Sequence, residues 1–296
     1  MKTDYAIPES ELLVNPDGSI YHLDMKPEDL APTIITVGDP GRVKEVSKYF
    51  DTITYKGHHR EFVTHTGYLN HKHLTVLSTG MGTDNIDIAL NELDALVNID
   101  FKTRTVKEHH TSLNIIRLGT SGAVREDVEV GTILISEAAI GMDNLMHFYA
   151  LENSIQETVY LEAFTNYMLP HFNRIRPYIA GAGSHLLRLF ENHYPKGTTV
   201  TASGFYGPQG RRLRLMPEFA DFIPVLHGFK HHHFRITNLE METAGIYGLG
   251  KLLGHQCLSV NAIIANRINH RFARNHKKLV KKMIEEALEI ITKEMF

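Results

Sequence analysis

Apolar and polar residues follow two different periods along this chain, and segments of the two kinds succeed one another. Short apolar runs that are typical of buried strands occur at residues 33–37, 113–118, 130–136, 198–202 and 257–265. Apolar residues at helical spacing occur at residues 86–97, 158–169, 184–190, 244–253 and 280–291. Strands that alternate with helices, without an internal repeat, predict a single α/β domain.

Three segments depart from this alternation. Residues 52–79 alternate apolar and polar positions and predict an antiparallel hairpin or meander. Residues 101–111 are charged and predict an exposed insertion. The N-terminal residues are polar with scattered apolar positions, so we expect residues 1–20 to form an arm and residues 21–296 to form the domain.

Composition narrows the class of protein. The chain has 43% apolar and 22% charged residues, which is ordinary for a soluble globular protein. Its net charge of -3 gives no basis for binding nucleic acid or an anionic membrane. Cys257 is the single cysteine, and the first residues lack the apolar segment of a signal peptide, so we expect a cytoplasmic location.

Two sequence patterns bear on whether the chain binds a metal ion or a nucleotide cofactor. The chain has 19 histidines, but those at residues 231–233, 58–59 and 109–110 lie in polar stretches, and there is no Cys-x-x-Cys. We therefore predict no metal site. The Gly-Met-Gly stretch at residues 80–82 is close to a dinucleotide fingerprint, but Asn85 stands where the third glycine belongs, so no nucleotide cofactor is predicted.

Arg117 interrupts the apolar run at residues 113–118, which continues into Gly-Thr-Ser-Gly at residues 119–122. This pattern predicts a buried strand that ends in a tight polar turn. A buried charge is costly unless it has a partner. Either Arg117 pairs with a structural carboxylate, or it binds an anion together with Thr120 and the glycine N–H groups. The segment alone leaves both interpretations open.

Two further arginines lie near predicted strand ends. Residues 38–42 read Gly-Asp-Pro-Gly-Arg, and the Asp-Pro pair suits an N-cap and a first helical position, which places Arg42 in the first turn of a helix. A helix N-terminus that carries an arginine suits phosphate, although a plain strand–helix junction has the same pattern. Arg42, Arg60 and Arg117 together could satisfy the oxygens of one inorganic phosphate.

Gln209 and Arg211 offer a different chemistry. A glutamine amide has both a donor and an acceptor, whereas arginine has donors only. The uracil edge, with O2, N3–H and O4, suits this pair better than a purine does, and Phe205 could stack on the ring. A solvated Gly-Pro turn is the alternative interpretation of these residues.

Glu240 and Glu242 are separated by one residue, so in an extended segment they point the same way. Two such neighbours suit the two hydroxyls of a ribose better than they suit glycoside hydrolysis, which needs carboxylates on opposite sides of a bond. Two solvated carboxylates ahead of a helix are the alternative.

Six motifs in this order resemble one known family. They are Gly-Asp-Pro-Gly-Arg (38–42), His-Arg-Glu-Phe (59–62), Ser-Thr-Gly-Met-Gly (78–82), Arg-Leu-Gly-Thr-Ser-Gly-Ala (117–123), Phe-Tyr-Gly-Pro-Gln-Gly-Arg (205–211) and Asn-Leu-Glu-Met-Glu-Thr (238–243). From about Tyr21 onward the chain resembles the uridine phosphorylases and the hexameric purine nucleoside phosphorylases. The resemblance implies an α/β domain with a mixed, twisted, partly barrel-like sheet flanked by helices. It also implies reversible phosphorolysis of a nucleoside to a free base and ribose 1-phosphate.

The resemblance assigns residues to three parts of a site. The phosphate-binding residues would be Gly38, Arg42, Arg117 and Thr120, with Arg60 from a neighbouring subunit. The ribose-binding residues would be Met241 and Glu242, with His22 from the neighbour, and the carboxylate pattern adds Glu240. The base-binding residues would be Phe205, Gln209 and Arg211. Sites shared in this way predict a homodimer or a higher homo-oligomer.

Arg267 favours the pyrimidine branch. The purine branch has Ser-Asp, whose aspartate protonates the purine, where this chain has Asn266-Arg267. Arginine does not act as an acid, but it stabilises negative charge on O4 of a departing uracil. The predicted catalytic residues are Arg117, Gln209, Arg211 and Arg267.

The predicted reaction converts uridine and inorganic phosphate to uracil and ribose 1-phosphate, with phosphate as co-substrate and no other cofactor. A purine nucleoside phosphorylase, a nucleosidase and a non-catalytic nucleoside-binding protein remain the alternatives. Two features depart from the family pattern: the insertion at residues 101–111, and the short segment at residues 268–278, where the family has a flap over the site. A smaller flap leaves the range of substrates open.

Overall fold

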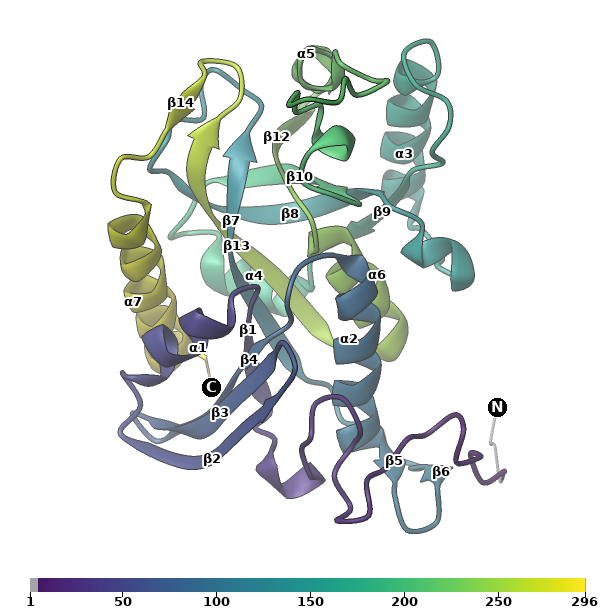
Figure 1. Ribbon diagram of the computed structural model, residues 1–296, viewed down its shortest axis with the longest axis vertical. Coiled ribbons are helices and arrows are strands. Elements are labelled where there is room, and N and C mark those ends of the chain that lie inside the picture. The colour runs from purple at the N-terminus through teal and green to yellow at the C-terminus, as the bar shows by residue number, and fades with distance from the viewer. Residues whose placement is uncertain (1–4, 296) are drawn as a thin grey trace.

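The computed structural model describes residues 5–295. Within these residues a twelve-stranded mixed sheet is surrounded by helices, and a separate two-stranded hairpin lies beside it (Figure 1). The strands of the large sheet are β1 (Thr33–Val37), β2 (Thr52–His59), β3 (Phe62–Leu69), β4 (Lys72–Ser78), β7 (Asn114–Ala123), β8 (Ile133–Met142), β9 (Tyr178–Gly181), β10 (Lys196–Ala202), β11 (Lys230–His231), β12 (Phe234–Glu240), β13 (Gln256–Asn266) and β14 (Arg271–Phe272). The hairpin consists of β5 (Ile99–Asp100) and β6 (Thr105–Val106) and lies at the predicted insertion.

Five strands of the large sheet close into a barrel. β7 pairs with β13, β13 with β8, β8 with β10 and β10 with β12. β12 then pairs back with β7 through Asn238 opposite Ala123 and Leu239 opposite Gly122. β1, β4, β3 and β2 extend the sheet from β7, and the last three form the predicted antiparallel meander. The predicted α/β domain with a mixed, partly barrel-like sheet is confirmed.

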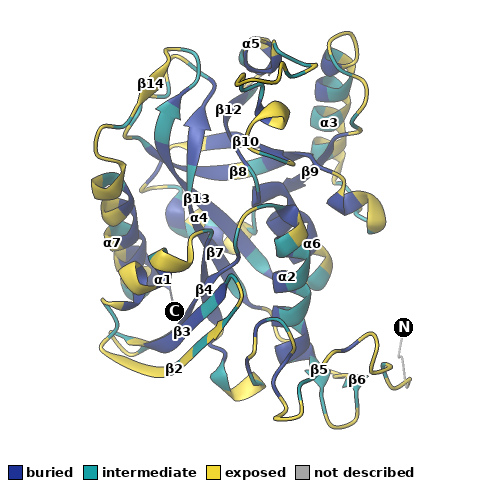
Figure 2. Cartoon of the chain, viewed as in Figure 1, coloured by how far each residue is buried: buried dark blue, intermediate teal, exposed yellow. Residues whose placement is uncertain are grey.

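The helices cover this sheet from several sides (Figure 1). They are α1 (Pro40–Ser47), α2 (Thr83–Asn98), α3 (Ile155–Met168), α4 (Ser184–Phe190), α5 (Phe222–Gly228), α6 (Thr243–Leu253) and α7 (His276–Glu294), with short 3-10 turns η1 (Pro27–Asp29), η2 (Leu145–Phe148) and η3 (Gly207–Gln209). The amphipathic pattern of residues 280–291 becomes the buried face of α7. Figure 2 shows the barrel strands in dark blue and the outer faces of α7 and β2 in yellow, so the core lies between the sheet and its helices.

The polar turn predicted at residues 119–122 is wrong. β7 continues through these residues, because each of them pairs with β13, from Asn261 opposite Gly119 to Ala265 opposite Gly122, with one shift in register after Ile263. Gly119 is needed for the Arg117 side chain rather than for a turn: a Cβ at Gly119 would lie 1.9 Å from Arg117 Nη1. Glycine here makes room for a guanidinium that lies across the strand.

The N-terminal arm predicted for residues 1–20 lies along the domain where it is described, from residue 5. Leu12 and Ile20 are buried in the same apolar cluster as α2. Arg104, in the turn of the β5–β6 hairpin, donates hydrogen bonds to the carbonyl oxygens of Ile7, Pro8 and Leu12. The insertion therefore holds the arm. No helix within residues 5–295 is long and apolar enough to cross a bilayer.

Candidate active site

A cavity of about 980 Å³ opens at one end of the barrel. It is lined by residues that follow or end β1, β4, β7, β10, β12 and β13, which is where α/β sheets bind ligands. The predicted site residues that line it are Gly38, Arg42, Arg117, Thr120, Phe205, Gln209, Arg211, Glu240, Met241, Glu242 and Arg267. Segments that are far apart in the sequence thus meet at one place, as the motif order led us to expect.

One end of the cavity lies at the N-terminus of α1. Asp39 caps this helix by accepting a hydrogen bond from the Gly41 backbone N–H, and Pro40 occupies the first position, as predicted. Arg42 points back toward β7, where its Nη1 donates to the Leu118 carbonyl oxygen at 3.3 Å. Burial lowers the pKa of Arg42. A partly buried cation with one weak hydrogen-bond partner, beside a helix N-terminus, suits a small anion.

Arg117 lies on β7 in the wall of the cavity and pairs with two carboxylates. Its Nη2 is 2.5 Å from Glu242 Oε2 and 2.9 Å from Glu240 Oε2, and all three side chains are buried. Burial by itself would lower the pKa of Arg117, but the two carboxylates outweigh it, and its pKa is raised. The structural pair that was one of the two interpretations of Arg117 is therefore present, and it faces the cavity.

Glu240 and Glu242 differ in how many hydrogen bonds their carboxylate oxygens accept from the protein. Glu240 accepts hydrogen bonds from the Thr201 hydroxyl and from the backbone N–H groups of Glu242 and Thr243, besides its contact with Arg117. In the described part of the chain, residues 5–295, Glu242 accepts only from the Gly82 backbone N–H, at 2.8 Å, and from Arg117. Glu242 thus retains acceptor capacity toward the cavity, whereas Glu240 is largely used by the fold.

Burial, partly opposed by Arg117, raises the pKa of Glu242, and the neighbouring Glu240 raises it further. The charge of this buried carboxylate is therefore stabilised mainly by Arg117, with the Gly82 backbone N–H as a second, weaker contribution. Such a group responds strongly to any positive charge that develops beside it.

A chain of buried polar side chains runs from Arg117 around the inside of the barrel, through β13, β8, β10 and β12, and returns to β7 at Ser121. Its links are Arg117 Nη1 to Asn261 Oδ1 (3.2 Å), Asn261 Nδ2 to Ser136 Oγ (2.9 Å), Ser136 Oγ to Thr199 Oγ1 (2.6 Å), Thr199 Oγ1 to Asn238 Oδ1 (3.0 Å) and Asn238 Nδ2 to Ser121 Oγ (3.0 Å). Each member is buried and lies on a barrel strand. The chain fills the barrel with satisfied polar groups and fixes the cavity floor.

Sequence reasoning missed this chain. Its signal was present, because uncharged polar residues interrupt otherwise apolar strands at Ser136, Thr199 and Asn261. Only the register of the barrel brings these interruptions together.

The other end of the cavity holds the predicted base-binding residues. The Arg211 guanidinium stacks on the Phe205 ring at 3.7 Å from its centroid, and its Nη1 donates to the Phe205 carbonyl oxygen (2.6 Å) and to Gln209 Oε1 (2.5 Å). Arg211 therefore orders the loop and takes one face of Phe205. Burial, and next the nearby Arg267, lower the pKa of Arg211 to about 10.

Three residues at this end were not predicted as site residues. His270, Arg271 and Phe272 line the cavity from the turn and strand that follow Arg267. β14 pairs antiparallel with β13, with Arg271 opposite Asn266. The short segment after Arg267 is thus a small hairpin at the cavity mouth, and α7 begins at His276.

Two predicted residues lie outside the cavity of their own chain. Arg60 is exposed in the turn between β2 and β3, with a φ of 53°. His22 contacts Glu92 on α2, with 2.6 Å between Nδ1 and Oε1. Their assignment to a neighbouring subunit stays a prediction. Among residues 5–295 no group of three or more His, Cys, Asp or Glu side chains is placed to hold a metal ion.

Comparison with known proteins gives one family. Residues 32–295 match the model of the phosphorylase superfamily. A uridine phosphorylase of Thermococcus kodakarensis is 29% identical over 281 residues, which cover 93% of this chain and 87% of that protein. A DeoD-type purine nucleoside phosphorylase of Buchnera aphidicola is 24% identical over 279 residues, covering 92% and 99%.

A solved structure agrees with this result. A Trypanosoma brucei nucleoside phosphorylase, described as showing uridine phosphorylase activity, superposes with a TM-score of 0.83 at 32% identity and covers 94% of this chain and 99% of its own. The match runs through all the strands and helices that build the cavity. This chain therefore belongs to the nucleoside phosphorylases of the phosphorylase superfamily.

Proposed function

We propose that this nucleoside phosphorylase acts on pyrimidine nucleosides and converts uridine and inorganic phosphate reversibly to uracil and ribose 1-phosphate. The observation that carries the proposal is the base end of the cavity, where Gln209, Arg211 and Arg267 meet without a carboxylate. A departing purine needs a proton at its ring nitrogen, and among residues 5–295 no carboxyl group lines this end of the cavity to supply it. A departing uracil needs its negative charge stabilised, and Arg211 and Arg267 line this end of the cavity, where they can do so.

Phosphate would bind between the α1 N-terminus and β7. Arg42 and the Thr120 hydroxyl face this part of the cavity, and the Gly38 backbone permits close approach. In the assembled enzyme Arg60 of a neighbouring subunit would add a further positive charge. Phosphate bound there lies on the side of the ribose away from the base, where an oxygen can attack C1′.

Ribose would bind against Glu242 and the Met241 backbone. The free acceptor capacity of Glu242 suits the 2′- and 3′-hydroxyls, and its charge favours the positive character that develops on the ribose as the glycosidic bond breaks. Glu240 would act indirectly by holding Arg117 and the start of α6. His22 of a neighbouring subunit completes this part of the proposal.

The base would meet Gln209 at its N3–H and O2 edge and the arginines at O4. The Gln209 amide oxygen has two lone pairs, so it accepts from Arg211 and from a uracil N3–H together. As the bond to C1′ breaks, its electron pair moves to the uracil, and Arg211 and Arg267 stabilise the anion. The step needs neither a metal ion nor a covalent intermediate, and phosphate is the only co-substrate.

The test is a substrate panel with and without phosphate. Uridine, thymidine, cytidine and inosine are incubated with the enzyme, and ribose 1-phosphate and free base are measured. We expect phosphate-dependent release of uracil from uridine at a rate well above that of hypoxanthine from inosine. Faster cleavage of inosine would identify a purine enzyme, and cleavage without phosphate would identify a nucleosidase. Binding without any cleavage would identify a nucleoside-binding protein.

A further inference from the structure

The base end of the cavity has an excess of positive charge. Arg211, Arg267 and Arg271 all line it, together with His270. The carboxylates that line the cavity are elsewhere: Asp39 caps α1, Glu61 lies against Gly80 beside Gly38, and Glu240 and Glu242 pair with Arg117. Uracil is a neutral base, so its recognition accounts for two of these arginines but leaves Arg271 without a role.

The ion pairs formed among residues 5–295 do not include Arg211, Arg267 or Arg271. Arg117, in the wall of the same cavity, by contrast pairs with two carboxylates. Arg267 Nη1 is buried and lacks a hydrogen-bond partner altogether. The lowered pKa of Arg211 has Arg267 as its second cause, after burial, which agrees with two guanidinium groups that lie close together without an intervening acid. Unpaired arginines in a cavity indicate an anionic ligand group.

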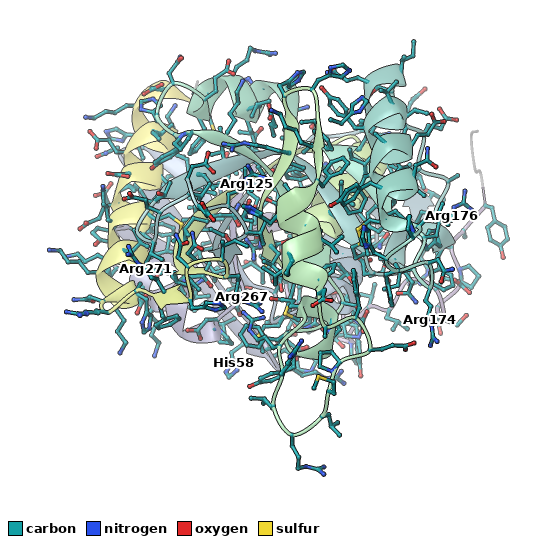
Figure 3. The ribbon with its side chains drawn as sticks, turned by 90° about the horizontal axis from the view of Figure 1, so that it is seen from above. His58, Arg125, Arg174, Arg176, Arg267 and Arg271 are labelled. Carbon is teal, nitrogen blue, oxygen red and sulfur yellow. The ribbon has the colours of Figure 1, made fainter. Side chains whose placement is uncertain are left out.

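β14 carries Arg271 to the mouth of the same cavity, where its side chain is exposed. Arg271 pairs with Asn266 across the β13–β14 ladder, and Asn266 Oδ1 accepts from the backbone N–H groups of Ile268 and Asn269 in the turn between them. Figure 3 shows Arg267 and Arg271 on the same side of the molecule, nearer to α7 than to α3. Arg271 therefore follows a turn that is held by backbone hydrogen bonds to Asn266.

The cavity also has room for a larger base. Its volume of about 980 Å³ is at the upper end of the range of roughly 300–1,000 Å³ that is usual for small-molecule sites. Phe205 and Phe272, which line this end, are 49% and 63% exposed, so neither side of the base site is closed against a substituent.

We propose that the base end recognises an anionic substituent on the pyrimidine ring, and that Arg271 selects nucleosides whose uracil carries a carboxylate at C5. C5 is next to C4, so such a carboxylate lies beside the O4 that Arg211 and Arg267 face. A guanidinium binds a carboxylate through two parallel hydrogen bonds. The inference rests on the proposed function for the orientation of the base.

The reaction itself is unchanged. A phosphate oxygen forms a bond to C1′, the bond from C1′ to N1 breaks, and its electron pair leaves with the 5-carboxyuracil. No oxidant or reductant takes part. The product base carries one more negative charge than uracil, and the third arginine balances that charge.

The experiment compares phosphorolysis of 5-carboxyuridine and uridine by the wild type and by Arg271→Gln. The matched control is Arg274→Gln, an exposed arginine three residues on that does not line the cavity. We expect kcat/KM for 5-carboxyuridine, relative to that for uridine, to fall by about tenfold or more in Arg271→Gln, since a charge-assisted hydrogen bond contributes about 1.5–3 kcal/mol. In Arg274→Gln the ratio stays within about twofold of the wild type. An equal loss for both substrates in Arg271→Gln overturns the proposal, as does a wild type that excludes 5-carboxyuridine.

A binding measurement separates this proposal from the proposed function. Free 5-carboxyuracil and uracil are titrated calorimetrically into the enzyme in phosphate buffer. Tighter binding of the carboxylated base that depends on Arg271 supports the inference even if uridine is not turned over, whereas turnover of uridine without such a preference leaves the function and removes the inference.

Discussion

Replacing Glu242 with glutamine is expected to lower the activity of the enzyme while leaving the protein folded. Glutamine has nearly the same shape, so its amide oxygen still accepts from the Gly82 N–H, now at 2.8 Å from Glu242 Oε1. The negative charge beside the ribose is lost. Arg117 keeps its 2.9 Å contact with Glu240 and is not left as an isolated buried cation.

The expected losses differ in size. A hydrogen bond to a charged group contributes about 1.5–3 kcal/mol, which corresponds to a decrease of about 10- to 150-fold in kcat/KM. The free energy of unfolding is expected to fall by about 1–2 kcal/mol, because the glutamine NH₂ group faces Arg117 in place of Oε2. Arg117 keeps Glu240 as a partner, and the loss of Glu242's charge removes its repulsion of Glu240, so this loss is smaller than that of a buried cation left alone. Activity should therefore fall while the fold persists.

Glu240→Gln is the matched variant. The Glu240 oxygens accept from two backbone N–H groups at the start of α6 and from the Thr201 hydroxyl. An amide NH₂ in place of one oxygen would face these donors, so we expect a loss of about 3 kcal/mol or more in the free energy of unfolding. The order of stability should thus be the wild type, then Glu242→Gln, then Glu240→Gln.

The assay combines two measurements on each variant. Urea unfolding is followed by tyrosine fluorescence, since the chain has 12 tyrosines and no tryptophan. Phosphate-dependent cleavage of uridine is measured at a temperature at which all variants are folded. Activity of Glu242→Gln within about threefold of the wild type would refute its role at the ribose. Equal stability of the two variants would refute the proposal that Glu240 mainly stabilises the fold and Glu242 mainly binds the ribose.

Three further predictions concern other parts of the chain. Arg42→Ala should raise KM for phosphate by about tenfold or more, measured at saturating uridine, because within residues 5–295 the one hydrogen-bond acceptor of this partly buried cation is the Leu118 carbonyl oxygen at 3.3 Å. Arg104→Ala should release the arm, seen as faster cleavage within residues 5–12 by a glutamate-specific protease, since three carbonyl oxygens lose their donor. Burial lowers the pKa of His65, so the unfolded chain binds a proton there more readily than the folded chain. Stability should then fall as pH drops below about 6.5, and His65→Gln should reduce that dependence in urea midpoints at two pH values.

The spacing of apolar residues along the sequence predicted most of the helices and strands, because most of these elements bury apolar residues on one or both of their faces. The helix at residues 184–190 occurs as α4 with the same limits, and the apolar positions of residues 280–291 form the buried face of α7. Capping signals also acted as expected, with Asp39 and Pro40 at the start of α1. These features depend on neighbours in the sequence, which are visible before the chain is folded.

Features that depend on strand register could not be predicted. Gly-Thr-Ser-Gly at residues 119–122 has the composition of a turn, yet these residues continue β7, because they pair with β13. Gly119 is glycine because a side chain there would collide with the guanidinium of Arg117. The buried chain through Asn261 and Ser136 requires β13 to lie beside β8. The sequence shows which residues are polar, but it does not show the register of the strands that brings Asn261 next to Ser136.

Arg117 is where the two kinds of inference meet. A structural carboxylate pair and an anion site first stood as alternatives for this residue. In the fold Arg117 contacts two carboxylates, so the group of three carries a net negative charge while both carboxylates are ionised. Such a group does not by itself attract phosphate, and the positive charge for phosphate must come from Arg42 and, in the proposed assembly, from Arg60. Arg117 instead holds Glu242 in a buried position in which its charge can act on the ribose, between the two ends of the cavity that bind phosphate and base in this proposal.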